Sequence, residues 1–132
     1  MVYFSLAEAA RRYDSHRPKV HHVIHDWLTD SNVNAQFQSS LDVACGTGDS
    51  TIPITKMSGS TVGVDISDEM LQRAKAKELD VRKVSYLDIS NLGKFDFIST
   101  CMAFHWFDEK EAISSYKRAS KHGAIWLIYN FS

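Results

Sequence analysis

A short apolar run that passes directly into a glycine-rich turn is the feature that most constrains the fold of this chain. Ser40–Ala44 has the character of a buried strand, and Gly46 and Gly48 follow it at once. Glycine has no Cβ atom, so a ligand can approach the backbone closely at such a turn. A buried strand that turns sharply into a helix in this way indicates a ligand site.

Further apolar runs follow, separated by helical stretches, and this alternation is typical of repeated βαβ units. The five expected strands are Ser40–Ala44, Thr61–Val64, Val81–Tyr86, Phe95–Thr100 and Ala124–Asn130. The first expected helix begins near Asp49 or Ser50. A second follows Ser67 and ends at about Glu78. A third follows Asp108 and ends at about Lys121, where His122-Gly123 opens the fifth strand. We therefore predict an α/β fold: a doubly wound, Rossmann-like, mainly parallel sheet of about five strands with helices on both faces.

Two more helices are expected before this sheet. We treat residues 1–132 as a single domain, with an N-terminal helical cover at 1–33 and an α/β core at 38–132. The second helix carries His21, His22 and His25, which include a pair at i and i+4. Because no nearby acid or cysteine completes a ligand set, we interpret them as a solvated helix face and predict no metal site.

Composition excludes several classes of protein. The chain is 44% apolar, which is enough for a packed core. Its net charge is -1, and its Lys and Arg residues do not cluster into the basic stripe that nucleic-acid binding needs. No apolar run approaches the roughly 18 residues of a membrane-spanning helix. The two cysteines form no CxxC pair, and no signal segment precedes the first helix. We expect a cytoplasmic protein without a nucleic-acid or membrane partner.

Asp65 ends the second expected strand, where a carboxylate can accept hydrogen bonds from two ribose hydroxyls. The alternative is a plain strand-ending aspartate that caps the next helix, although Ser67 is better placed for that cap. A dinucleotide-binding loop would carry a third glycine where Thr51 stands, and no Gly-Lys-Ser/Thr sequence follows. These departures argue against an NAD site and against a Walker phosphate loop.

Three segments in order resemble the motifs of class I S-adenosylmethionine-dependent methyltransferases. They are L-D-V-A-C-G-T-G from Leu41, V-G-V-D-I-S-D-E-M-L from Val62 and F-D-F-I-S-T-C-M-A-F-H-W-F from Phe95. The likeness is closest to the small-molecule branch that includes trans-aconitate and ubiquinone-pathway methyltransferases. It implies an enzyme that transfers a methyl group from S-adenosyl-L-methionine to a small-molecule acceptor by in-line displacement.

The resemblance also implies a set of cofactor-binding residues. They are Tyr13 and Arg17 in the N-terminal cover, Asp42, Ala44, Gly46 and Gly48 around the methionine portion, Asp65 on the ribose, Ile66 and Met70 on the adenine ring, Asp88 on the adenine amino group, and Cys101 after the fourth strand. Alternatives stay open for three of these residues. Asp42 can be a buried acid bonded to neighbouring backbone N–H groups, Asp88 an ordinary Asx turn, and Arg17 a surface arginine.

His105 and Trp106, in the third motif, are the catalytic candidates by the same resemblance. A histidine titrates in the range that suits a general base, which a hydroxyl or amine acceptor would need. Packing or lining of the site is the alternative for His105. Trp106 either walls the sulfonium by cation–π attraction or fills core space, and we expect the second.

The likeness ends early, because members of the family continue past the fifth strand whereas this chain stops at Ser132. We expect the carboxyl-terminal part to be missing, which leaves the apolar strand Ala124–Asn130 as an uncovered sheet edge. A truncated form, a homodimer through that edge, and loss of activity with retained binding all fit. The alternative function is thus a non-catalytic or truncated methyltransferase-like module that binds the cofactor or a protein partner.

Overall fold

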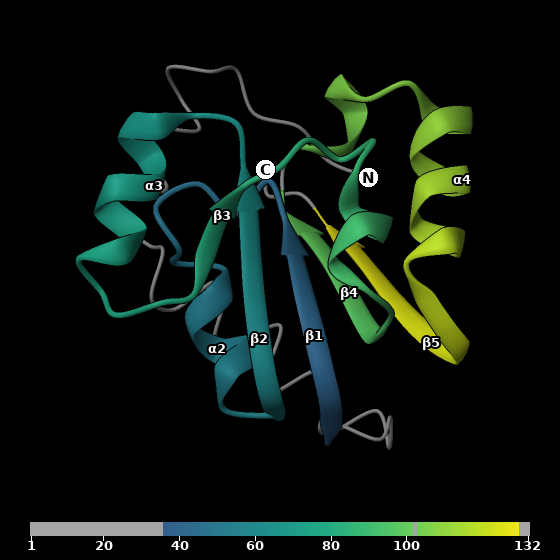
Figure 1. Cartoon of the computed structure of the whole chain (residues 1–132), viewed down its shortest axis with the longest axis horizontal. Coiled ribbons are helices and arrows are strands. Elements are labelled where there is room, and N and C mark those ends of the chain that lie inside the picture. Colours follow the sequence, from purple (N-terminus) through teal and green to yellow (C-terminus); the bar gives the residue numbers. More distant parts are fainter. Residues whose placement is uncertain (1–35, 102, 130–132) are drawn as a thin grey trace.

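The computed structural model describes residues 36–101 and 103–129, which contain a five-stranded sheet (Figure 1). All neighbouring strands are parallel, in the order β3-β2-β1-β4-β5. The strands are β1 (Phe37–Val43), β2 (Ser58–Asp65), β3 (Val81–Lys83), β4 (Phe95–Cys101) and β5 (Ser120–Tyr129). The predicted Rossmann-like parallel sheet is confirmed.

The expected N-terminal helices lie outside the described residues, and so do the predicted cofactor residues Tyr13 and Arg17. The histidines at positions 21, 22 and 25 lie outside them as well. Within the described residues, no helix has the length and apolar content needed to cross a membrane.

Helices cover both faces of the sheet, as predicted. They are α2 (Thr51–Thr55), α3 (Asp68–Lys75) and α4 (Glu109–Arg118), with the 3₁₀ helices η1 (Ile89–Leu92) and η2 (Phe104–Trp106). Successive strand side chains point to opposite faces. Leu41 therefore joins the core cluster under α4, in which Tyr116 is fully buried. Phe97 packs on the opposite face with Ile54 of α2.

The caps of α3 and α4 are the predicted ones. The Ser67 hydroxyl accepts the Met70 N–H at 3.3 Å, and the Asp108 carboxylate accepts the Glu111 N–H at 2.9 Å. Acidic side chains occupy the first turn of each helix and basic side chains the last turn, which suits the helix dipole. Sequence therefore located the beginnings of both helices. The shorter α2 begins at Thr51, directly after Ser50.

The predicted junction between the last helix and the fifth strand was wrong. Helix α4 ends at Arg118, not near Lys121, and β5 already begins at Ser120. Ser120 pairs with Phe95, and the register then shifts, so that Ile125 is the partner of Phe97. The intervening residues form an irregularity within the strand in which Gly123 has φ of 78°. His122-Gly123 is typical of a helix end in the sequence, but in the structure it lies within this irregularity of β5.

Strand β3 is also shorter than predicted, because only Val81–Lys83 pairs with β2. The next three residues, 84–86, leave the sheet. The last strand, β5, pairs with β4 along one side, and within the described residues no strand pairs with its other side. The sheet edge that we expected at β5 is therefore present in this part of the chain.

Candidate functional site

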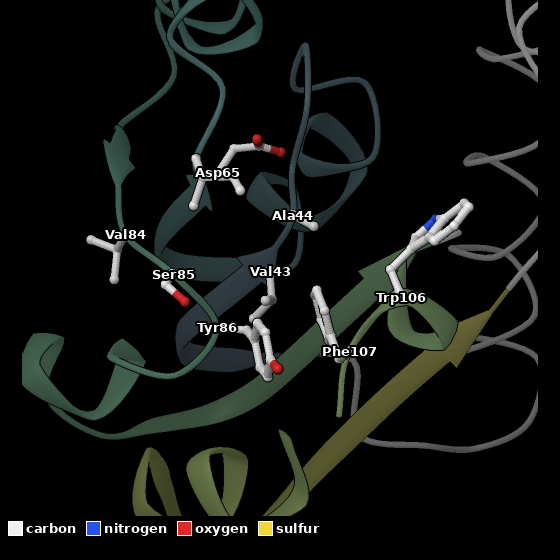
Figure 2. A pocket seen from close by; sticks show the side chains of 9 residues that line it. Val43, Ala44, Asp65, Val84, Ser85, Tyr86, Trp106 and Phe107 are labelled. Atoms are coloured by element: carbon white, nitrogen blue, oxygen red, sulfur yellow. The ribbon is translucent and has the colours of Figure 1, made fainter. Parts of the chain in front are cut away.

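The carboxyl ends of β1 and β2 and the segments that follow β3 and β4 meet at a cavity of about 250 Å³, the place where open parallel sheets bind ligands. Figure 2 shows the side chains around it. They are Val43, Ala44, Asp65, Ile66, Val84, Ser85, Tyr86, Trp106 and Phe107. The volume lies below the roughly 300–1,000 Å³ of typical small-molecule pockets, so the cavity suits one part of a ligand. Four of these residues were predicted for the site: Ala44, Asp65, Ile66 and Trp106.

The turn after β1, residues 44–50, which we call the glycine turn, contains three left-handed residues. Ala44, Gly46 and Gly48 have φ of 59°, 56° and 90°. A Cβ atom added at Gly46 would meet nothing within 4 Å, so this side of the backbone is open to a ligand. A Cβ atom at Gly48 would lie 2.4 Å from Leu79 Cδ1. The two glycines thus differ in their surroundings: the space beside Gly46 is open, whereas Gly48 packs against the end of α3.

Asp65 connects the glycine turn to the end of β2. Its Oδ2 accepts the Gly46 N–H and its Oδ1 accepts the Ser67 N–H, each at 2.9 Å. A carboxylate has about four lone-pair positions, so further donors can bind to the same group. Figure 2 shows this carboxylate directed toward the turn that follows Ala44. Because Ser67 itself caps α3, the alternative of Asp65 as the helix cap is not what the structure shows.

Asp42 lies beneath the glycine turn and is fully buried. Its Oδ2 accepts hydrogen bonds from the Ser50 and Thr51 hydroxyls at 2.6 and 2.7 Å, and its Oδ1 accepts one from the Ser99 hydroxyl at 3.0 Å. The backbone N–H partners proposed in the alternative interpretation are therefore wrong, because hydroxyls take their place. Asp42 joins the start of α2 to β4 and does not line the cavity.

The environment of Asp42 favours its protonated form. Burial raises the pKa of this carboxyl above its ordinary value of 3.8, and repulsion from Asp65 adds to the rise. The three hydroxyl hydrogen bonds oppose that shift, because they stabilise the anion. Burial also raises the pKa of the Cys45 and Cys101 thiols, so both cysteines are neutral and neither is a ready nucleophile.

Other predicted cofactor residues lie around the cavity at different distances from it. Ile66 is 70% exposed and lines the cavity, so its side chain is available to cover a ligand. Met70 is exposed on α3 but is not part of the lining. Asp88 is exposed just before η1, and its side chain makes no capping bond there. Cys101 is buried at the end of β4, away from the lining.

The two catalytic candidates both lie in η2. Trp106 lines the cavity and is 65% exposed, so the expectation that it fills core space was wrong. The short 3₁₀ helix turns the indole outward instead of packing it against the sheet. His105 is exposed, and its ring centroid lies 4.7 Å from that of Trp106. It does not line the cavity itself.

Sequence reasoning missed the aromatic wall of the cavity. The Tyr86 and Phe107 rings stack with centroids 4.0 Å apart and an interplanar angle of 11°. The Tyr86 hydroxyl accepts the Asp108 N–H at 3.1 Å, and the Tyr86 carbonyl accepts the Ser115 hydroxyl at 2.6 Å. The signal was hidden because Val84 and Tyr86 follow Val81 closely, so the sequence predicted one strand from Val81 to Tyr86. Within the described part of the chain, no three His, Cys, Asp or Glu side chains gather as a metal site would require.

Comparison with known proteins agrees with this arrangement. The family model described as a methyltransferase domain matches residues 41–123. An uncharacterized methyltransferase-like protein of Schizosaccharomyces pombe is 30% identical over 123 residues, which are 89% of this chain and 48% of that protein. A demethylmenaquinone methyltransferase of Staphylococcus saprophyticus is 38% identical over 69 residues, 46% of this chain and 30% of that enzyme.

Solved structures give the same result. The crystal structure of an S-adenosylmethionine-dependent methyltransferase from Clostridium acetobutylicum superposes with a TM-score of 0.71 at 28% identity, covering 90% of this chain and 55% of that one. The chain thus spans about half the length of such proteins.

Proposed function

Because the chain belongs to the methyltransferase-domain family, we propose that it forms the cofactor-binding part of an S-adenosylmethionine-dependent methyltransferase that acts on a small-molecule acceptor. The observation that carries the proposal is the glycine turn with Gly46 open to a ligand beside the Asp65 carboxylate, at the edge of a cavity. The family assignment confirms the prediction of a class I methyltransferase and of S-adenosylmethionine as its cofactor.

The residues around the cavity fit such a cofactor. The open backbone at Gly46 suits the methionine portion, and the remaining lone pairs of Asp65 suit the two ribose hydroxyls. The exposed Ile66 side chain suits one face of the adenine ring. Asp42, Gly48, Met70, Asp88 and Cys101 keep their predicted places around the cofactor as part of this proposal. Asp42 would act by supporting the turn from beneath and Gly48 by packing within it, because both residues are buried.

The bound cofactor supplies a methyl group activated on a positively charged sulfur. Transfer by in-line displacement then depends on alignment and on the exclusion of water. The stacked Tyr86–Phe107 pair and the Trp106 indole form an apolar wall that can exclude water. His105, exposed beside Trp106, is the candidate base for a hydroxyl or amine acceptor.

A small-molecule acceptor is supported by the relatives and by the cavity. The matched Staphylococcus saprophyticus enzyme is a demethylmenaquinone methyltransferase, and three aromatic side chains line the cavity of this chain. The acceptor site and the activity of the whole protein belong to this proposal, since the chain spans about half of its relatives. A cytoplasmic location and pairing through the β5 edge are further parts of the proposal.

The alternative is a module that binds the cofactor without turnover, which the limited coverage of the relatives keeps open. The same turn argues against an NAD-dependent oxidoreductase. A dinucleotide-binding loop would carry its third glycine where this chain has Thr51, and the Thr51 hydroxyl donates to the buried Asp42. A methylation assay that follows product formation separates an enzyme from a binding module.

Calorimetric titration with S-adenosylhomocysteine tests the cofactor site. We expect saturable one-site binding that Asp65→Ala abolishes, and no binding of NADH. Asp80→Ala is the matched control, because Asp80 is an exposed aspartate that pairs only with the neighbouring Arg82 among its described side-chain contacts. Absence of binding by the folded wild-type protein, or equal binding by the Asp65→Ala variant, would count against the proposal.

A further inference from the structure

A lysine beyond the end of α3 contacts the outer side of the glycine turn. Lys77 Nζ donates to the Thr47 carbonyl at 2.8 Å and to Asp49 Oδ1 at 2.8 Å. The other oxygen of Asp49 accepts the Thr47 hydroxyl at 3.1 Å. One ammonium group therefore holds a backbone carbonyl and a carboxylate that are two residues apart in the turn.

This contact differs from the surface ion pairs nearby. The Lys77 and Asp49 side chains are 32% and 14% exposed, whereas both partners are more than half exposed in the Arg73–Glu69 pair, at 62% and 75%. Exposed pairs are screened by water and contribute little. Hydrogen bonds from a charged donor in a partly shielded place are stronger and more directional. The Lys77 contact is thus able to fix a backbone conformation.

The chain leaves α3 in a way that directs two side chains at the glycine turn. The Lys77 and Glu78 N–H groups donate to carbonyls three residues earlier, and Glu78 then takes φ of 64°. A left-handed glutamate is strained, and such strain persists only where the surroundings impose it. The next residue, Leu79, lies against the α carbon of Gly48. Leu79 and Lys77 therefore hold the same turn, one by packing and one by hydrogen bonds.

The rest of the glycine turn has other supports. Asp65 holds the Gly46 N–H, and Asp42 holds the Ser50 and Thr51 hydroxyls. Lys77 contacts the middle of the turn, between those two points. We propose that Lys77 is a positioning residue for the cofactor site, which keeps the middle of the turn in the conformation that opens Gly46 to the ligand. The inference rests on the proposed function, because the ligand is the cofactor.

The physical consequence is a change in cofactor affinity. When the ammonium group is lost, the turn samples other conformations, and the apparent affinity falls by the fraction of molecules that remain competent. We expect Lys77→Met to weaken binding of S-adenosylhomocysteine roughly tenfold, the scale of one charged hydrogen bond. Lys77→Arg should restore binding to within about threefold, because arginine supplies donors to both acceptors.

Calorimetry on the full chain, paired with hydrogen exchange, tests the inference. Lys75→Met is the matched control: Lys75 has the same charge in the last turn of α3 and is exposed. Binding by Lys75→Met should equal that of the wild type. Amides of residues 47–50 should exchange faster in Lys77→Met alone, while those of α3 stay unchanged. General destabilisation of the fold would not confine the faster exchange to the turn, and Lys77→Arg would not restore binding. Faster exchange in the turn alone, with binding restored by arginine, therefore indicates a positioning role.

The outcomes separate this inference from the proposed function. If the wild type binds and Lys77→Met binds equally well, the role of Lys77 is refuted while the cofactor site stands. If Lys75→Met loses as much affinity, the effect is one of general charge and the inference fails. No binding by the wild type removes the proposed function and this inference with it. Should Lys77→Met not fold, Lys77→Gln removes the same ammonium group but keeps a polar side chain, and wild-type affinity in that variant refutes the inference.

Discussion

Alanine at Gly48 is expected to destabilise the protein far more than alanine at Gly46, although both glycines lie in one turn. At Gly48, the added Cβ would lie 2.4 Å from Leu79 Cδ1 and 3.3 Å from the Ala74 Cβ. Overpacking of this kind costs about 1–3 kcal/mol. The left-handed φ of 90° adds roughly 1 kcal/mol for a residue with a Cβ atom. Because Leu79 Cδ1 is the end of a side chain that can turn away in part, the packing cost lies at the lower end of that range, and Gly48→Ala should lower the free energy of unfolding by about 2–3 kcal/mol.

At Gly46 we expect a smaller loss of stability and a larger loss of ligand affinity. The left-handed φ of 56° again costs roughly 1 kcal/mol, but the added Cβ meets nothing within 4 Å. The open side of Gly46 is where we place the cofactor, so the methyl group would occupy space that the ligand needs. Gly46→Ala should weaken S-adenosylhomocysteine binding at least roughly tenfold, equivalent to ~1.4 kcal/mol.

Urea unfolding and calorimetry on both variants measure these effects. The shift of the urea midpoint gives the stability loss if the slope is unchanged. The double variant Gly48→Ala/Leu79→Ala provides an internal check, since removing the leucine removes the clash and the two losses should not add. Equal stability losses at the two glycines, or strict additivity in the double variant, would refute the packing argument. Wild-type affinity in Gly46→Ala would refute the placement of the ligand.

Two further predictions concern charge and backbone strain. Burial raises the pKa of Asp42 above 3.8, so the folded state retains a proton that the unfolded state releases. The stability of the wild type relative to Asp42→Asn should therefore fall as pH rises above about 3.8, levelling off beyond the raised pKa, and thermal unfolding of both proteins from pH 3.5 to 8 measures it. A constant difference would show that Asp42 does not titrate abnormally. Glu78→Gly should raise stability by roughly 0.5–1 kcal/mol in urea, because glycine adopts the left-handed φ without strain; a loss would show that the glutamate side chain makes stabilising contacts.

The sequence predicted where most strands lie because they contain short apolar runs, and the central strands β1 and β4 are the most deeply buried. The prediction failed at β3, where the apolar residues do not end with the strand. Val84 and Tyr86 follow Val81–Lys83, yet residues 84–86 leave the sheet and place Tyr86 in the wall of the cavity. Stacking of Tyr86 on Phe107 joins segments that are far apart in the chain, and no local pattern encodes it.

The site was predictable only in part, for a related reason. The positions of Gly46 and Asp65 at the cavity edge could be predicted because they depend on local backbone form and on strand ends, while their roles toward the cofactor stay a prediction. The core role expected for Trp106 was wrong because Trp106 lies in the 3₁₀ helix η2, none of whose residues is buried. Lys77 gave no signal at all, since a lysine near a helix end usually serves only the helix dipole. Its partner in the turn is visible only in three dimensions.

The buried Asp42 shows how the partners of an acid inside a sheet follow from its place in the fold. A carboxylate inside a parallel sheet needs donors, and a strand that already pairs on both sides has no spare N–H groups for it. The donors must then come from neighbouring elements, and in this protein they are hydroxyls. Ser50 and Thr51 at the start of α2 and Ser99 in β4 supply them. Thr51 thus does more than break the dinucleotide motif, because its hydroxyl helps to hold the start of α2 against the sheet and so supports the glycine turn.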